Sequence, residues 1–218
     1  MAPRKATTKT PRAYHKGNVS KDLVTVTTRI LAEESVEALS VRRLAREVGV
    51  TPANFYNHFP SLEHLLLDVA AEGFDQMAEN TRRYMQKAKT RKDGLVEACI
   101  GFVFFAIDNK QLFRIMFGQV PDATQHDRFR DASGAAFAQM VRLMYGEWRY
   151  DREHLMQTHH NAAAAYGLFS LIHGLARNII DDQFEFETGS RTEIRQFCED
   201  VVLTFVDGTG AKVMAGAG

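Results

Sequence analysis

The sequence predicts an all-α protein with two helical units, and three observations support this fold class. Apolar side chains recur at helical spacing along most of the 218 residues. Residues that cap or stop helices separate these amphipathic segments, and no strand pattern or hairpin dipeptide competes with them. We expect a disordered basic arm (residues 1–19), a three-helix unit (20–66) continuing as a long helix to about residue 88, a helical bundle (89–208) and a flexible tail (209–218).

The chain is expected to enter its first helix after the basic arm. Residues 1–19 hold five Lys or Arg, no acidic residue and two prolines, a composition that disfavours packed structure. Such an arm can attract phosphate, or it can act only as a solubilising tail. Ser20 is the predicted N-cap of the first helix. The apolar stripe of that helix comprises Leu23, Val26, Ile30 and Leu31.

Residues 40–59, SVRRLAREVGVTPANFYNHF, predict two short helices joined by a tight turn. Ser40 caps the first helix, and Gly49 ends it at a position that favours a left-handed backbone. Thr51 caps the second helix, which has Pro52 at its first position, where the missing N–H costs nothing. The apolar positions of the pair are Val41, Leu44, Ala45, Val48, Phe55 and Phe59.

A long helix is predicted after the break at Pro60 and Ser61. Its apolar face comprises Leu62, Leu65, Leu66, Val69, Ala70, Phe74 and Met77. Further helices are predicted over residues 93–106, 112–117, 129–145, 152–180 and 190–208. Asp93 is the predicted N-cap of the first of these, and Ser190 with Glu193 forms a capping-box pattern before the last.

The composition is that of a soluble globular protein, with 45% hydrophobic and 25% charged residues. No apolar run reaches the roughly 18 residues of a membrane-spanning helix, and the N-terminus lacks the apolar segment of a secretory signal. Cys99 and Cys198 fall within apolar helical patterns, which indicates buried free thiols rather than a disulfide framework. We therefore expect a cytoplasmic protein without membrane association.

The charge of the chain is unevenly distributed although its formal net value is zero. Residues 1–66 hold ten basic and six acidic side chains, whereas residues 67–218 hold 17 and 21. This asymmetry fits a nucleic-acid-facing module attached to a body that does not bind nucleic acid. Chance accounts equally well for a difference of this size, so the distribution supports the interpretation only together with a motif.

The helix pair has the pattern of a helix-turn-helix, whose second helix enters the major groove of DNA. Phe55 and Phe59 are expected to face the core, which leaves polar side chains on the outer faces. Hydroxyl and ring N–H groups can bind phosphate, and Asn54 or Asn57 can pair with adenine. The candidate DNA-contacting residues are Arg42, Arg43, Thr51, Pro52, Ala53, Asn54, Tyr56, Asn57 and His58.

This stretch resembles the TetR family of transcriptional regulators. The matching features are Ser40, Leu44-Ala45, Gly49-Val50, Thr51, Tyr56, His58-Phe59 and the segment from Pro60 to Leu66. The resemblance implies an N-terminal domain that binds a double-stranded DNA operator and a more variable C-terminal domain that binds a ligand. Family members often have a phosphate-binding Lys where this chain has Leu62, and the basic arm could compensate for that contact.

The second half is similar to one subgroup of that family. FAIDNKQLFRIMF (residues 105–117) looks like a segment common in the subgroup, and FSLIHGLA (169–176) is similar to its Trp-x-x-Val-His-Gly-Leu-Ala. The resemblance implies a pocket for a small effector between the middle helices. Walls rich in Phe and Met suit an apolar ligand, although such stripes are also typical of an ordinary core. The candidate ligand-binding residues are Phe102, Phe105, Phe113, Met116, Phe117, Phe137, Met140, Met144, Tyr166, Phe169 and His173.

Four histidines raise the question of a metal site. Adjacent His159 and His160 face different directions on a helix, and His154 and His159 are five residues apart rather than four. We therefore expect no metal and no other cofactor, and we expect His173 to be a hydrogen-bonded core or pocket residue. The chain lacks Gly-x-Ser-x-Gly, a phosphate-binding loop and Cys-x-x-Cys, so no enzyme activity is expected.

The sequence thus predicts a dimeric repressor that a small apolar effector releases from a palindromic operator. The helices over 152–180 and 190–208 carry apolar faces that need covering, and a second copy of the same pair would complete a four-helix bundle. Such a homodimer presents two recognition helices to half-sites about 34–36 Å apart. The alternatives are a helical ligand-binding protein or enzyme with a non-functional helix-turn-helix, and an activator or nucleoid-associated family member.

Overall fold

The computed structural model describes residues 18–145, 159–184 and 189–208, and the regular secondary structure of these residues is entirely helical. The all-α prediction is therefore confirmed. The helices are α1 (Val19–Glu33), the 3-10 helix η1 (Val36–Ala38), α2 (Val41–Val48), α3 (Pro52–Tyr56), α4 (Leu62–Met85), α5 (Arg91–Asp108), α6 (Lys110–Met116), α7 (Asp127–Tyr145), α9 (His159–Ile180) and α10 (Arg191–Gly208). None of these described helices is long and apolar enough to cross a membrane.

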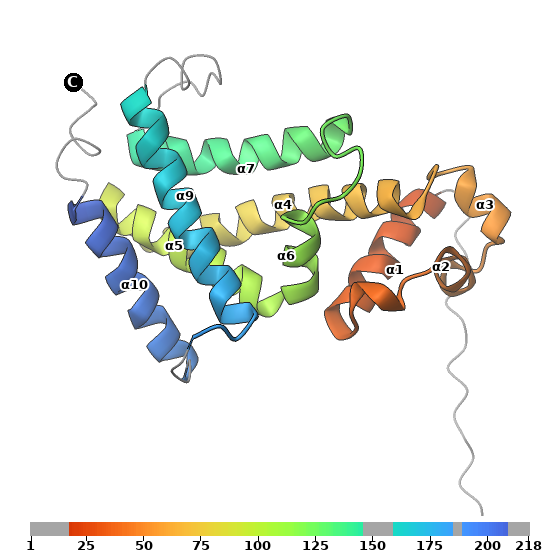
Figure 1. The fold of residues 1–218 in the computed structure, drawn as a ribbon, viewed down its shortest axis with the longest axis horizontal. Helices are drawn as coiled ribbons and strands as arrows, with labels where there is room; N and C mark the ends of the chain where they lie inside the picture. The colour runs from red at the N-terminus through yellow and green to blue at the C-terminus, as the bar shows by residue number, and fades with distance from the viewer. Residues whose placement is uncertain (1–17, 146–158, 185–188, 209–218) are drawn as a thin grey trace, which may run out of the picture.

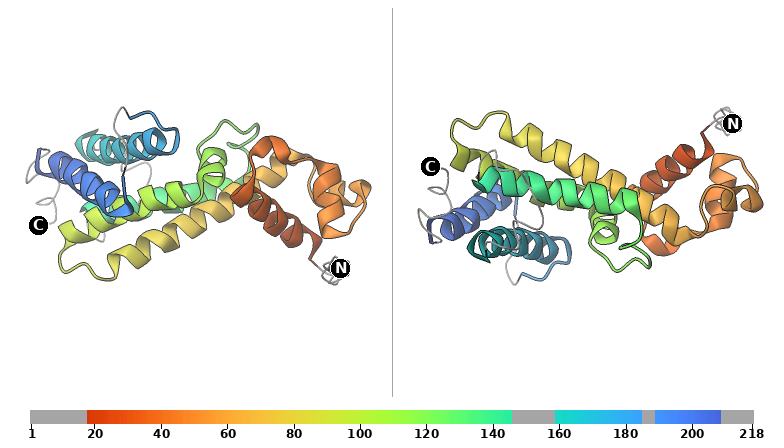
Figure 2. Two further views of the ribbon diagram at one scale, coloured as in Figure 1. Left: turned by 90° about the horizontal axis from the view of Figure 1, so that it is seen from below. Right: turned by 90° about the horizontal axis from the view of Figure 1, so that it is seen from above.

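Helix α4 connects the two parts of the molecule (Figure 1). Helices α1, α2 and α3 lie at its N-terminal end, whereas α5, α9 and α10 gather beside its C-terminal half. Helix α6 lies between the two groups and packs against both α1 and α4. Figure 2 shows α7 running alongside α4. One hydrophobic cluster spans both parts, from Leu23, Leu44 and Phe55 to Ile100 and Val202.

Several of the predicted helix signals are found in the structure. The hydroxyls of Ser40 and Thr51 each accept a hydrogen bond at 3.2 Å from a backbone N–H in the first turn of the helix that follows. Gly49 has a φ of 83°, in the left-handed region that residues with a Cβ disfavour. Ser190 and Glu193 exchange hydrogen bonds at the start of α10. These local signals set the ends of α2, α3 and α10.

Two N-cap predictions are wrong. Helix α1 begins at Val19, which is buried in the core, so Ser20 lies inside the helix. Helix α5 begins at Arg91, because Thr90 and not Asp93 is its N-cap. Thr90 and Asp93 form a capping box, in which the acidic residue occupies the third helical position and bonds back to the cap.

Parts of three predictions fall outside the described residues. These are residues 1–17 of the basic arm, residues 152–158 of the long helix and the tail over 209–218. Helix α7 begins at Asp127, two residues before the predicted start. His126 precedes it, and its Nδ1 accepts a hydrogen bond from the Phe129 N–H at 3.2 Å. The sequence pattern missed this cap because histidine is not a usual N-cap residue.

Candidate nucleic-acid interface and ligand cavity

Helices α2 and α3 form a supported pair with one buried and one exposed face. Phe55 is fully buried, and Phe59 lies beside it with the two ring centroids 5.9 Å apart. Leu44 and Ala45 are buried on the side of α2 that faces α1. These apolar contacts attach the inner side of α3 to the core. The opposite side of α3 remains accessible to a binding partner.

Most candidate DNA-contacting residues of the helix pair and its following turn are exposed. The exposed ones are Arg42, Thr51, Pro52, Ala53, Tyr56, Asn57 and His58. Tyr56 is the most telling, since 57% of this large aromatic residue is accessible. Asn54 differs, because its Oδ1 is buried and has no hydrogen-bond partner among the described residues. Of the two asparagines that could contact a base, Asn57 is the one presented to solvent.

The second helix of the pair is shorter than the sequence predicts. We expected it to continue through Phe59 to the break at Pro60, whereas α3 spans Pro52–Tyr56. Proline disfavours a helical conformation in the residue before it, and Asn57 and His58 accordingly form a turn before the non-helical Phe59. The Phe59 N–H still bonds to the Phe55 carbonyl at 3.0 Å, which keeps both rings on the core side.

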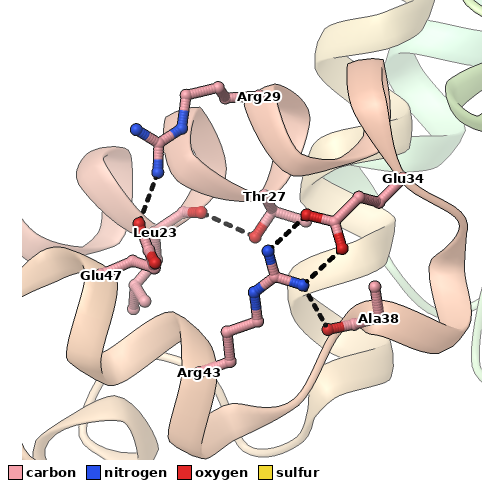
Figure 3. A network of polar contacts seen from close by, with 7 residues as sticks. All are labelled: Leu23, Thr27, Arg29, Glu34, Ala38, Arg43 and Glu47. Atoms are coloured by element: carbon pink, nitrogen blue, oxygen red, sulfur yellow. Dashed lines mark hydrogen bonds and ion pairs between the residues drawn. The ribbon is translucent and has the colours of Figure 1, made fainter.

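Arg43 makes contacts that the sequence does not predict (Figure 3). Its guanidinium donates to both carboxylate oxygens of Glu34, at 2.5 and 2.8 Å, and to the Ala38 carbonyl at 3.2 Å. The pair lowers the pKa of Glu34, chiefly through the hydrogen bond from Arg43. Nearby, Arg29 pairs with Glu47 at 2.7 Å. Arg43 therefore links α2 to the end of α1.

An apolar cavity of about 370 Å³ lies between α4, α5, α6, α7 and α9. Its size falls in the range of small-molecule sites, which is about 300–1,000 Å³. The residues that line it are Phe74, Met77, Ala78, Thr81, Leu95, Ala98, Cys99, Phe102, Met116, Phe117, Gly118, Phe129, Ser133, Ala136, Phe137, Gln139, Met140, Leu143, Phe169 and Ile172.

The candidate ligand-binding residues divide into two groups. Those on the cavity wall are Phe102, Met116, Phe117, Phe137, Met140 and Phe169. Phe105, Phe113 and Met144 are buried in the core away from the wall, and Tyr166 is 45% exposed on α9. Helical spacing marks a buried face without showing which neighbours it meets, so core and wall positions look alike in the sequence. Ligand contacts at all these positions remain a prediction.

His173 packs behind the cavity and is not among its lining residues. Its ring stacks on Phe113 and Phe169, with centroids 5.7 Å away in both cases, and meets the edge of Phe117 at 4.8 Å. We expected a hydrogen-bonded histidine, but Nε2 is buried without a partner among the described residues. Burial, and then the charge of Arg177, lower the pKa of His173, so the neutral ring is favoured.

Sequence reasoning missed two polar groups on the cavity wall, Thr81 of α4 and Gln139 of α7. The Thr81 hydroxyl donates to the Ala78 carbonyl at 2.9 Å and accepts from Gln139 Nε2 at 3.0 Å. Gln139 Nε2 also lies 3.4 Å from the Ala78 carbonyl. A signal was present in the sequence, because both residues interrupt otherwise apolar helix faces.

The two cysteines are buried free thiols, as predicted. Cys99 lines the cavity, and burial raises the pKa of both the Cys99 and Cys198 thiols to about 12. Both remain protonated at neutral pH and are therefore poor nucleophiles. Within the described residues, no group of three potential ligands could hold a metal ion.

The exposed helix pair and the helical domain that α4 joins to it define a helix-turn-helix protein with a second, cavity-containing domain. Residues 23–69 match the family model of the bacterial regulatory proteins of the tetR family, and residues 95–202 match the tetracyclin repressor-like C-terminal domain. The chain therefore belongs to the TetR family. It is a DNA-binding transcriptional regulator rather than an enzyme, and regulators of this family bind operators and typically dimerise.

Individual proteins that resemble this chain have low sequence identity to it. An uncharacterized HTH-type transcriptional regulator of Haemophilus influenzae is 27% identical over 135 residues, which cover 60% of this chain and 63% of the relative. A protein with unknown function from Rhodococcus sp. RHA1 superposes with a TM-score of 0.68, 23% identity and coverage of 89% and 97% of the two chains. The fatty acid degradation regulator FadR from Bacillus halodurans superposes with a TM-score of 0.61 and 14% identity, and the match covers 89% of this chain and 97% of FadR. These structural likenesses concern the fold alone.

Proposed function

We propose that the protein is a dimeric repressor that leaves a palindromic operator when a small apolar effector enters the cavity. The observation that supports this proposal is that helix α4 belongs both to the DNA-binding part and to the wall of the cavity. Its first turn follows directly on the DNA-facing segment, and its Phe74, Met77 and Thr81 line the cavity. A ligand that displaces these side chains therefore acts on the same helix that follows α3 in the chain.

Helix α6 offers a second route between the two sites. Met116 and the following Phe117 line the cavity, while α6 packs against α1 of the DNA-binding domain. A change in either helix can alter the distance between recognition helices in a dimer. Reducing operator affinity tenfold requires only about 1.4 kcal/mol of differential ligand affinity.

The dimer interface is proposed to lie on the outer face of α9 and α10. Leu171, Val201 and Phe205 line a shallow groove there together with polar Asp200 and Thr204. In a two-fold symmetric dimer, the groove of one subunit would pack against the same groove of the other subunit. Such a dimer would also hold two α3 helices at half-sites about 34–36 Å apart, or a multiple of this.

The proposed DNA contacts can be tested by selecting bound duplexes from a random pool and measuring affinity at several salt concentrations. We expect an inverted-repeat preference and an affinity that falls steeply with salt, because phosphate contacts release counterions. Tyr56→Ala should weaken binding to all sequences similarly. Asn57→Ala should also relax the preference at one base position, at a cost of about 1–3 kcal/mol for a bidentate contact.

The matched control is Gln76→Ala, an exposed polar residue of α4 away from the helix pair. If Tyr56→Ala or Asn57→Ala left the affinity for DNA unchanged, the substituted residue would not belong to the DNA interface. Weak binding that is equal for random and genomic duplexes and insensitive to salt would refute the proposed function.

A further inference from the structure

The wall of the cavity is chemically one-sided. Six phenylalanines contribute to it, namely Phe74, Phe102, Phe117, Phe129, Phe137 and Phe169. Among the described residues that line it, none is Asp, Glu, Lys, Arg or His. An ionised group placed there would lose its hydration without gaining a counterion, which is costly in an apolar site. The cavity therefore selects against charged ligands.

The orientation of the Gln139 amide follows from its neighbours. The Thr81 hydroxyl proton is committed to the Ala78 carbonyl, so Thr81 Oγ1 is left as an acceptor toward Gln139. The Ala78 carbonyl is an acceptor as well. Two acceptors call for the NH₂ side of the amide, and the Gln139 nitrogen accordingly faces both.

This arrangement leaves the amide oxygen of Gln139 without a partner among the described residues. Gln139 Oε1 makes no hydrogen bond with any residue in the described part of the chain, and Gln139 lines the cavity. Of the other polar lining groups, the Ser133 hydroxyl donates to the Arg130 carbonyl at 3.2 Å, which leaves its oxygen as a weaker acceptor than an amide carbonyl, and the Cys99 thiol is a weak partner. A ligand that supplies one donor satisfies the remaining atom.

We infer that the effector is an uncharged molecule with an apolar body and one hydroxyl or N–H group that donates to Gln139 Oε1. This inference rests on the proposed function, which makes the cavity the effector site. It specifies that the ligand is uncharged and that Gln139 Oε1 is the atom that accepts its hydrogen bond. The accepting atom also depends on both α4 and α7, since Thr81 of α4 orients the side-chain amide of Gln139 on α7.

Three probes of similar length test the inference on the full-length protein: 1-decanol, decyl methyl ether and decanoate. Each is titrated at neutral pH against bound N-phenyl-1-naphthylamine, an uncharged fluorescent dye. Decanol should bind about fivefold to tenfold more tightly than the ether, which lacks the donor. Decanoate should bind at least about a hundredfold more weakly than decanol, because its carboxylate must be desolvated.

Two variants locate the effect. Gln139→Met keeps the length of the side chain, removes the acceptor and should abolish the preference for decanol over the ether. Gln76→Met makes the same change at an exposed position of α4 and should leave the preference intact. The comparison of the three probes on the wild-type protein stands even if Gln139→Met folds poorly.

Equal binding of decanol and the ether, tighter binding of decanoate, or failure of all three to displace the dye would overturn the inference. A preference that persists in Gln139→Met would do the same. Operator binding, measured with and without decanol, separates this inference from the proposed function. Decanol that binds with the expected preference but leaves operator affinity unchanged would contradict only the repressor mechanism. Operator release by decanoate alone would contradict only the polarity of the ligand.

Discussion

At the scale of single residues, Arg43 has two competing partners. Its bidentate pair with Glu34 fixes the end of α1 against α2, and the same guanidinium stands near the start of the helix-turn-helix. Exposed ion pairs contribute little to folding because water and salt screen them. A phosphate of bound DNA would therefore compete with Glu34 for this guanidinium.

The variant Glu34→Gln should consequently raise affinity for DNA of any sequence. Freed from its partner, Arg43 can contact phosphate, and the plot of log affinity against log salt should become steeper by about 0.9. The matched control is Glu47→Gln, which removes the same charge but releases Arg29 of α1 instead. Filter binding at four salt concentrations measures both. Identical slopes in the two variants would show that Arg43 does not reach phosphate.

His173 predicts a dependence of stability on pH. Its pKa in the folded protein lies below the ordinary value of 6.5, so folding favours the neutral ring. The stability that this provides is present above pH 6.5 and is lost as the pH falls, because the unfolded chain takes up the proton more readily. Urea unfolding between about pH 7.5 and 5.5 should show a smaller decline for His173→Phe than for the wild type. Parallel declines would mean that other groups dominate.

At the scale of helices, the contact between α4 and α6 is unusually close at Gly73. A Cβ placed there would lie 2.7 Å from Met116 Sδ and 3.1 Å from Leu112 Cδ1. Met116 also lines the cavity, so its flexible end can yield into that space. A larger residue at position 73 therefore reaches the ligand site indirectly.

Gly73→Ala should lower the affinity for decanol at least about fivefold while lowering the free energy of unfolding by no more than about 2 kcal/mol. Crowding costs about 1–3 kcal/mol, and replacing a helical Gly by Ala returns about 1 kcal/mol. Gly134→Ala on α7 is the matched control, since a Cβ there meets nothing within 4 Å and the residue does not line the cavity. Dye displacement and urea unfolding measure the two effects. A full loss of stability without loss of affinity would argue against the displacement of Met116.

The same scale shows why the fold was more predictable than the cavity. Caps and apolar stripes are encoded within a few residues, so Ser40, Gly49 and Thr51 could be assigned from the sequence. Phe102 and Phe105 lie three residues apart on one helix, yet only Phe102 reaches the cavity. Which residue does so depends on where α7 and α9 cross α5, and a single chain's periodicity contains no information about that crossing.

At the scale of the whole molecule, the proposed dimer can be disrupted without touching either binding site. Leu171→Arg places a charge in the groove between α9 and α10, which a self-complementary interface would have to bury. We expect a folded monomer in sedimentation equilibrium and a loss of operator affinity of at least about a hundredfold, since linked half-sites gain about 10² or more from bivalency. Gln76→Arg adds the same charge on exposed α4 and should remain dimeric. A dimeric Leu171→Arg would place the interface elsewhere.

Helix α4 has a further mechanical consequence. Its 24 residues form a rod about 36 Å long at 1.5 Å per residue, with the sensing side chains toward one end and the DNA-facing segment joined to the other. A tilt of only about 5° moves the far end of such a lever by about 3 Å. In a two-fold pair the two levers swing in opposite senses, so the separation of the reading heads changes by up to twice that amount. Under the proposed mechanism, an effector would need neither to unfold a helix nor to close a domain, because such a tilt alone would displace the α3 helices relative to the fixed repeat of the double helix.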